Sequence, residues 1–302
     1  MQKIKIVSLF CLFGWFLPVT SNAQNVEELV SKYTSENGQK YMQPFADAFS
    51  ANLNSGLFHN AVINKLGFQI YLGIETQLAV IPSSQKFMTA SAEGDYFPST
   101  RVENVPTVFG PSEGKRVEDP NTGLVYVFPG GLDIGYVPMI TPQLTVGSVY
   151  GTDLTIRFAG TKKIEDVGDI SLFGWGLRHS IDQYFPLPFS SAIGFYNQKF
   201  KFGDYLDASS SIISLQGSYS IPFLTLYGGL GYEMGSMKIS YEYENLENGQ
   251  TEEIRFDLTP GNTIRLTTGF GLNLGPVNLH AEYNLAKQST ISAGLGIGFG
   301  YK

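Results

Sequence analysis

The sequence predicts an all-β fold, an antiparallel transmembrane β-barrel of about 12–14 strands with a short N-terminal helical segment. Charged residues are only 16% of the 302 residues, aromatic residues are 14%, and glycines number 34. An average soluble protein has roughly 25% charged residues. Apolar and polar residues also alternate with period two over segments of roughly 11–16 residues, longer than most globular strands and long enough to cross a bilayer at a tilt.

The N-terminus, MQKIKIVSLFCLFGWFLPVTSNAQ, has the pattern of a secretory signal peptide. Lys3 and Lys5 precede an apolar stretch, and small residues precede a cleavage site expected between Ala23 and Gln24. A membrane anchor is the alternative, but the apolar stretch is too short to span a bilayer. Cys11 lies inside that stretch without the small residues that lipid attachment requires. We therefore expect residues 1–23 to be removed and the protein to reach the cell outer membrane.

Charge and cysteine content exclude several classes of function. The net charge is −7, and loss of Lys3 and Lys5 makes it −9, which argues against a nucleic-acid partner. Cys11 is the only cysteine and would leave with the signal peptide, so we expect no disulfide and no thiol chemistry. The three histidines have no short metal-ligand spacing, so neither a metal site nor a cofactor is expected.

Residues 24–60 are predicted to form a helical segment that plugs or braces the lumen, ahead of a barrel formed by residues 61–302. Asn25 can cap a helix over residues 25–38, and Asn37-Gly38 supplies a stop signal. Residues 41–58 continue with apolar residues at mixed spacing and end in an Asn/Ser/Gly turn.

Residues 66–80 begin the predicted barrel. Apolar side chains lie on one face of this strand, whereas polar side chains and glycine lie on the other. The final segment, TISAGLGIGFGYK, has the same alternation, and we expect it to pair with residues 66–80 so that the sheet has no free edge. Similar alternation recurs in residues 151–160, 170–184, 191–203, 210–221, 223–233, 263–275 and 276–286.

The connections predict which end of the barrel faces outward. Breaks such as Asp204-Tyr205, Ile221-Pro222 and Gly275-Pro276 leave room for tight hairpins only. Residues 82–130 are rich in Pro, Gly and charge, and predict one long loop with a possible hairpin. Residues 237–258 predict a hairpin that projects beyond the membrane. Long loops lie outside in such barrels and short turns lie in the periplasm.

Four stretches resemble a family of Bacteroidota-type outer-membrane barrels of unknown function, distantly similar to long-chain fatty-acid transporter barrels. These stretches are ADAFSANLNSGLFHNA, DVGDISLFGWGLRHSIDQYFP, FYNQKFKFGD and LTLYGGLGYE. The resemblance covers roughly residues 25–302. The family implies no known activity, whereas similarity to the transporters implies an N-terminal hatch in the lumen and passage of apolar molecules.

Charged side chains on the polar faces are the candidate functional residues. They could guide a charged solute or form a ladder of ion pairs that holds the barrel rigid. Charge on the lipid face at mid-bilayer costs about 2–4 kcal/mol for Arg or Lys, so we expect these residues to face the lumen. They are Glu75, Arg157, Arg178, Asp182, Glu233, Arg265, His280 and Glu282.

A catalytic site is not expected. His280 with Glu282, or His179 and Ser180 with Asp182, could belong to a lipid-hydrolysing triad. Strand parity, however, places His179 on the lipid face and Ser180 and Asp182 on the lumen face. The glycines of residues 229–235 and 269–271 resemble a dinucleotide fingerprint, but no helix follows them.

Three functions remain open from the sequence. The first is a channel or transporter for small molecules, including hydrophobic ones. The second is a structural or interaction barrel with a plugged lumen that acts through its outer loops. The third is an outer-membrane lipid hydrolase. The expected partners are outer-membrane lipid, a small hydrophobic ligand and the barrel-assembly machinery.

Overall fold

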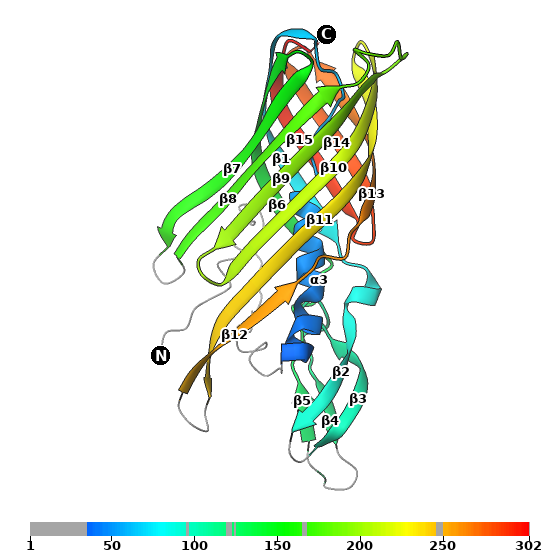
Figure 1. Ribbon diagram of the computed structural model, residues 1–302. Coiled ribbons are helices and arrows are strands. Elements are labelled where there is room, and N and C mark those ends of the chain that lie inside the picture. The colour runs from blue at the N-terminus through cyan, green and yellow to red at the C-terminus, as the bar shows by residue number, and fades with distance from the viewer. Residues whose placement is uncertain are drawn as a thin grey trace.

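Ten antiparallel strands close into a barrel (Figure 1). The computed structural model describes residues 35–94, 97–118, 123, 125–164, 168–245 and 250–301. Within these residues an eleven-stranded sheet forms, of which all strands but β12 belong to the ring. Around the ring the strands are β1 (Leu66–Val80), β6 (Tyr136–Val149), β7 (Thr152–Ile164), β8 (Gly168–Ser180), β9 (Ser190–Phe202), β10 (Leu206–Ile221), β11 (Leu224–Asn245), β13 (Ile264–Leu274), β14 (Val277–Leu285) and β15 (Thr290–Phe299).

The ring closes where β15 pairs with β1. Ile70 lies opposite Phe299, and the antiparallel register continues to Ala79 opposite Thr290. On the far side, β10 pairs with β11 from Leu206 to Ile221. The predicted pairing of the last strand with the first is confirmed, and no wall strand of the described chain keeps a free edge along the barrel.

The number of wall strands is ten, fewer than the 12–14 predicted. Five further strands lie outside the ring. β2 (Phe87–Gly94) pairs with β3 (Phe97–Pro106), β4 (Lys115–Glu118) pairs with β5 (Val125–Phe128), and β12 (Gln250–Leu258) pairs with the far end of β11. Period two occurs in any strand with two different faces, so alternation alone does not distinguish a wall strand from an accessory hairpin.

The accessory strands gather at one end of the barrel, which we call the loop end (Figure 1). Residues 82–130 were predicted to form one long loop with a possible hairpin. They contain two hairpins, β2–β3 and β4–β5, and the short 3-10 helix η1 (Ser83–Gln85). We call residues 81–135 the outer module. Residues 237–258 form the predicted hairpin, because the end of β11 pairs with β12 from Met237 opposite Leu258. Its projection beyond the membrane stays a prediction. The opposite end, the turn end, has the connections at residues 150–151, 181–189, 222–223 and 275–276.

The two faces of the wall differ as the alternation predicts. On β15, Ile291, Leu295, Ile297 and Phe299 point outward with 45%, 55%, 52% and 56% of their surface exposed. The intervening positions are small and point inward. Large apolar residues are exposed on the other wall strands too, as expected of an outer surface in contact with lipid.

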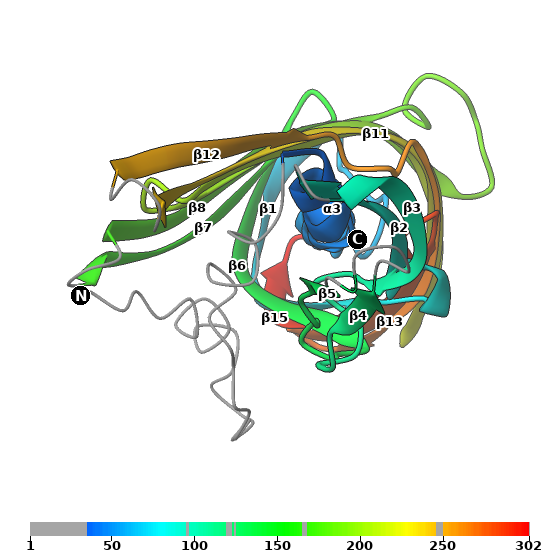
Figure 2. The same ribbon diagram turned by 90° about the horizontal axis from the view of Figure 1, so that it is seen from below.

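The helix α3 (Ser35–Leu53) lies inside the ring when the barrel is seen along its axis (Figure 2). The prediction that Asn37-Gly38 ends a helix is wrong, since α3 runs through both residues. A Cβ at Gly38 would come 2.2 Å from the ring of Phe256, so glycine permits close contact with β12. The helix ends at Leu53, before the predicted Asn/Ser/Gly turn. The signal peptide and most of the predicted helix over residues 25–38 lie outside the described residues.

A hydrophobic core joins α3 to the outer module and to the loop-end halves of the strands. Tyr41, Phe45 and Phe49 are buried along one side of the helix. The Tyr41 hydroxyl donates to the carbonyl of Gly130 at 2.9 Å, and Phe49 packs edge-on against Phe200 with ring centroids 4.8 Å apart. The helix and the module are thus one packed unit. Among the described helices, none has the length and apolarity to span a membrane.

Candidate functional site

The candidate site is the contact between the barrel wall and residues 50–64, which we call the lumen segment. This segment comprises the end of α3 and the chain that leads to β1. At its start the hydroxyls of Ser50 and Ser210 are 2.8 Å apart. At its end the Asn64 amide donates to the carbonyl of Gly300 at 2.6 Å. The segment therefore runs along the lumen from the loop-end half to the turn end.

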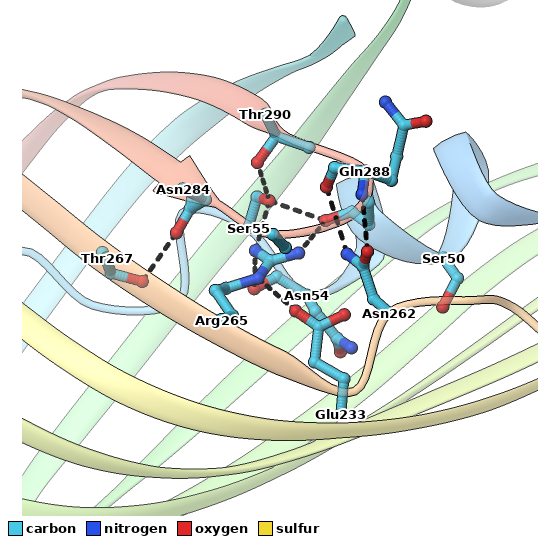
Figure 3. A network of polar contacts seen from close by, with 12 residues as sticks. Ser50, Asn54, Ser55, Glu233, Asn262, Arg265, Thr267, Asn284, Gln288 and Thr290 are labelled. Atoms are coloured by element: carbon cyan, nitrogen blue, oxygen red, sulfur yellow. Dashed lines mark hydrogen bonds and ion pairs between the residues drawn. The ribbon is translucent and has the colours of Figure 1, made fainter. Parts of the chain in front are cut away.

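Arg265 of β13 binds the end of α3 (Figure 3). Its guanidinium donates to the carbonyls of Ala51 and Asn54, both at 2.9 Å, and to the hydroxyl of Ser55 at 2.7 Å. These carbonyls lie where a helix leaves acceptors unsatisfied and carries partial negative charge. Arg265 also forms an ion pair with Glu233 of β11, and both side chains are almost fully buried.

Arg157 of β7 binds the next part of the lumen segment. It donates to the carbonyls of Leu53 at 3.3 Å and Ser55 at 2.9 Å, and to the carbonyl of Gly56. Its Nε donates to Gln143 at 2.8 Å, which orients the guanidinium. Arg157 is 1% exposed, so most of its donors are used on main-chain oxygens of one short stretch.

Arg178 of β8 binds the segment nearer the turn end. It donates to the carbonyl of Asn60 at 2.5 Å, and it forms a two-pronged ion pair with Asp153 of β7. One residue further, the amide N–H of Ala61 donates to the Ser218 hydroxyl at 2.9 Å. Three arginines from three strands thus bind successive parts of the lumen segment.

Acidic side chains balance these arginines and bind the segment's N–H groups. Glu282 accepts from the N–H of Gly56 at 2.8 Å and from the Asn284 amide at 2.8 Å. Glu75 accepts from the Tyr71 hydroxyl at 3.0 Å. Buried carboxylates and guanidinium groups require such partners, because an unpaired ion in this environment costs several kcal/mol.

His280 links Glu75 to the turn end of the lumen. Its Nε2 lies 2.8 Å from a Glu75 oxygen, and its Nδ1 lies 2.8 Å from the Asn278 side-chain oxygen. Both ring nitrogens therefore lie within hydrogen-bond distance of a side-chain oxygen. The ring of His59, on the lumen segment, stacks on His280 with centroids 4.8 Å apart. His59 is buried, and its Nδ1 has no hydrogen-bond partner among the described residues.

The structure brings together seven of the eight candidate residues on the inner face of the wall: Glu75, Arg157, Arg178, Glu233, Arg265, His280 and Glu282. Asp182 does not join them. It lies in the turn after β8, where it accepts from the Ser180 hydroxyl and the Ser191 N–H. His280 contacts Glu75 rather than Glu282, and His179 contacts Thr152 and Tyr184.

Sequence reasoning missed the residues of the lumen segment that meet the arginines. They present mostly main-chain carbonyls, which carry no sequence signal. The available signal was Ser, Asn and Gly repeated inside the otherwise apolar stretch of residues 49–58, which is unusual for a simple apolar helix. The residues that accept from the arginines are Ala51, Leu53, Asn54, Ser55, Gly56 and Asn60. Sequence reasoning also missed residues of the segment that contact the wall without an arginine, namely Ser50, Asn52, His59 and Ala61.

One cavity lies at the turn end of the lumen segment, and another lies beside the earlier part of α3. The first, of about 730 Å³, opens at the turn end and is lined by His59, Tyr71, Asn278 and Tyr301 among others. Burial raises the pKa of the Tyr301 hydroxyl to about 12, so it stays a hydrogen-bond donor at neutral pH. The second, of about 720 Å³, lies at the loop end between α3 and β2. The described residues contain no group of three or more potential metal ligands.

Gly56 lies between the side chains of Arg157 and Glu75, so a larger side chain there tests how closely the wall surrounds the lumen segment. Its φ is +66°, and a Cβ would lie 3.4 Å from both Arg157 and Glu75. Gly56→Val is expected to lower the free energy of unfolding by more than the roughly 1–2 kcal/mol of left-handed backbone strain alone. Gly275→Val is the matched control, because Gly275 has φ +64° with nothing within 4 Å of its Cβ position. Equal losses in urea unfolding for the two variants would contradict the close packing around Gly56.

Several solved outer-membrane proteins align with most of this chain at low similarity. The outer membrane protease OmpT of Escherichia coli aligns with 78% of this chain and 98% of its own, at 9% identity and a TM-score of 0.36. Ail of Yersinia pestis aligns with 77% of this chain and 99% of its own, at 14% identity and a TM-score of 0.26. The translocator domain of the autotransporter NalP of Neisseria meningitidis aligns with 83% of this chain and 92% of its own, at 14% identity and a TM-score of 0.30. These likenesses carry no information on activity.

Comparison at the level of sequence gives a family but no activity. No curated protein matches the chain. One family model, described as a family of unknown function, matches residues 1–299, nearly the whole length. The chain, which folds as an outer-membrane-type β-barrel with a segment of itself bound along the lumen, therefore belongs to this family of unknown function, DUF6588.

Proposed function

We propose that the protein is an outer-membrane barrel sealed by its own lumen segment, and that it acts by interaction through the outer module and the β11–β12 hairpin. One observation carries this proposal. Arg157, Arg178 and Arg265, all buried, bind main-chain carbonyls of the lumen segment from three different strands. An open channel would require these bonds to break.

The bonds make spontaneous opening costly. A hydrogen bond to a charged group contributes about 1.5–3 kcal/mol when its partner would otherwise stay unsatisfied. Arg157 and Arg265 each make several such bonds within residues 51–56. Removing the segment would also separate α3 from the hydrophobic core that it shares with the outer module. A sealed resting state follows from both contributions.

The loop end offers the surface for interaction. Long connections lie on the outer side of such barrels, so the outer module and the β11–β12 hairpin would face the cell exterior. The sequence places five glutamates and no basic residue in positions 242–253 of this hairpin. Because α3 and the module share one core, the exposed surface is held in a fixed position relative to the wall.

A gated passage for small molecules, including hydrophobic ones, is the second candidate. The cavity at the turn end favours it, since a solute that enters there would meet the lumen segment at His59 and Asn60. In that case the lumen segment would have to move during transport. The two candidates therefore differ in whether function requires motion of residues 50–64.

A disulfide between the lumen segment and the wall separates the candidates. The hydroxyls of Ser50 and Ser210 are 2.8 Å apart, so Ser50→Cys with Ser210→Cys places two sulfurs within bonding reach. Cys11 lies in the predicted signal peptide, which leaves no competing thiol. We expect the double variant to oxidise almost completely. The purified protein should show no stable conductance in planar bilayers, whether oxidised or reduced.

The opposite result supports the gated passage. If the reduced form conducts ions or releases a small apolar dye from vesicles, and oxidation abolishes this, the sealed interaction barrel is wrong. Ser50→Cys alone is the control, because it makes the same helix substitution without the cross-link. A double variant that failed to oxidise in folded protein would contradict the position of α3 itself.

A further inference from the structure

The connection between β8 and β9, residues 181–189, presents apolar side chains to its surroundings. Tyr184, Phe185, Leu187 and Phe189 have 65%, 60%, 41% and 45% of their surface exposed. No charged residue occurs between Asp182 and Lys199. Figure 2 shows this connection, in light green, projecting sideways from the barrel wall. A solvent-exposed loop normally carries charged and polar side chains at its tip.

The polar groups of this loop are turned inward and bonded. Asp182 accepts from the Ser191 N–H at 2.9 Å and from the Ser180 hydroxyl at 3.0 Å. The Gln183 amide donates to the carbonyls of Ser180 at 3.0 Å and Tyr150 at 3.3 Å. Main-chain bonds within the loop join Tyr184 to Ile181 and Leu187 to Phe185. Internal pairing of polar groups with apolar side chains outside is what a low-dielectric medium requires.

The loop also contacts the outer face of the wall where it joins β8 and β9. The Phe189 ring lies 3.9 Å from the position that a Cβ of Gly217 would take on β10. The Tyr184 hydroxyl contacts Nε2 of His179, at the end of β8, at 2.9 Å. The neighbouring outward residues are apolar and exposed, among them Leu177, Ile193, Leu215 and Tyr219. The apolar surface of the loop is thus continuous with the outer apolar surface of the barrel.

We propose that residues 184–189 insert into the lipid leaflet at the turn end and anchor the barrel there. The partner is the interfacial zone of the bilayer, where aromatic rings with one polar atom lie favourably. Tyr184 fits this zone through its hydroxyl, and Phe185, Leu187 and Phe189 fit the adjoining acyl region. This proposal concerns membrane contact and does not depend on whether the lumen is sealed or gated.

Tryptophan fluorescence tests the insertion. The full-length protein is prepared with Trp15→Phe and Trp175→Phe, and Phe185→Trp then supplies one reporter. In vesicles containing lipids brominated near the headgroup, we expect about a twofold loss of emission, as for a ring at the membrane interface. Aqueous iodide should quench it weakly. Val127→Trp, on exposed β5 of the outer module, is the matched control and should respond to iodide but not to brominated lipid.

Two outcomes would overturn the proposal. Strong quenching of Phe185→Trp by iodide, equal to that of Val127→Trp, would mean that the loop lies in water. Weak quenching by both agents would mean that protein covers it, either a second copy or another part of this chain. Trp175 in the unmodified protein points outward from β8 and gives the reference signal for a ring on the wall.

Discussion

Replacing Arg265 with methionine is expected to lower the free energy of unfolding by about 3–5 kcal/mol. Methionine fills much of the volume but leaves Glu233 as a buried charge without its ion-pair partner. It also removes donors from the carbonyls of Ala51 and Asn54 at the end of α3. Urea unfolding of the protein in detergent–lipid micelles, followed by tryptophan emission, measures the change.

Two further variants separate the cost of the unpaired Glu233 charge from the loss of an ordinary ion pair. Adding Glu233→Gln to Arg265→Met should recover part of the stability, because the unpaired charge is then gone. Lys201→Met is the control, since its ion pair with Asp207 is more than half exposed on the lysine side and such pairs contribute about 0–1 kcal/mol. A loss below that of Lys201→Met would contradict the role assigned to Arg265 in holding the lumen segment.

Cysteine labelling in intact cells is expected to give an all-or-none result for the direction of the chain through the barrel. Lys40 lies on α3 near the loop end with 42% of its side chain exposed, and Lys65 is exposed at the turn end. If the loop end faces outward, a membrane-impermeant maleimide labels Lys40→Cys in intact cells. Lys65→Cys is labelled only after the outer membrane is permeabilised.

The reverse pattern would place the outer module in the periplasm and remove the basis for interaction at the cell surface. Labelling of both variants in intact cells would indicate a damaged membrane, which periplasmic enzyme release detects. Ser50→Cys serves as the buried control, since Ser50 is 5% exposed and should stay unlabelled on both sides. The two accessible positions bracket the lumen segment, so together they establish its direction.

Much of the wall was predictable because a period of two leaves only two faces. Where one face is apolar and the other polar, a slip of one residue would expose every buried group, so the register follows from the pattern. The outward positions of β13 illustrate this, with Ile264 and Leu266 exposed and Arg265 buried between them. Hairpin positions followed equally well from turn residues such as Gly275, which has φ +64°.

The number of wall strands and the extent of α3 could not be predicted for a different reason. Both depend on which surfaces meet in three dimensions. Gly38 is a helix stop signal in isolation, yet it lies inside α3, at a position where the Phe256 ring leaves no space for a Cβ. Close packing between distant parts of the chain overrides a local stop signal, and no local pattern reports it.

The inward glycines of β15 are a second case in which contacts between strands cannot be read from the sequence of one strand. Glycine at positions 294 and 296 leaves little side-chain volume of β15 itself on the inner face of the wall. A Cβ at Gly294 would lie 2.2 Å from a Glu75 oxygen, and one at Gly296 would lie 2.5 Å from the Tyr71 ring. These glycines make room for large side chains of the adjoining strand β1. Strand pairing determines which residue uses that space, so the sequence of one strand cannot show it.

The lumen segment also has a consequence for how the barrel is assembled. The strands that meet at the seam are the first and the last of the ring, β1 and β15. Asn64 binds both sides of this seam, with its N–H on Gln69 of β1 and its side chain on Gly300 just after β15. Ser55 contacts Thr290 at the other end of β15. The segment therefore hydrogen-bonds both strands of the seam, and its contacts with both strands can form together only once the ring has closed.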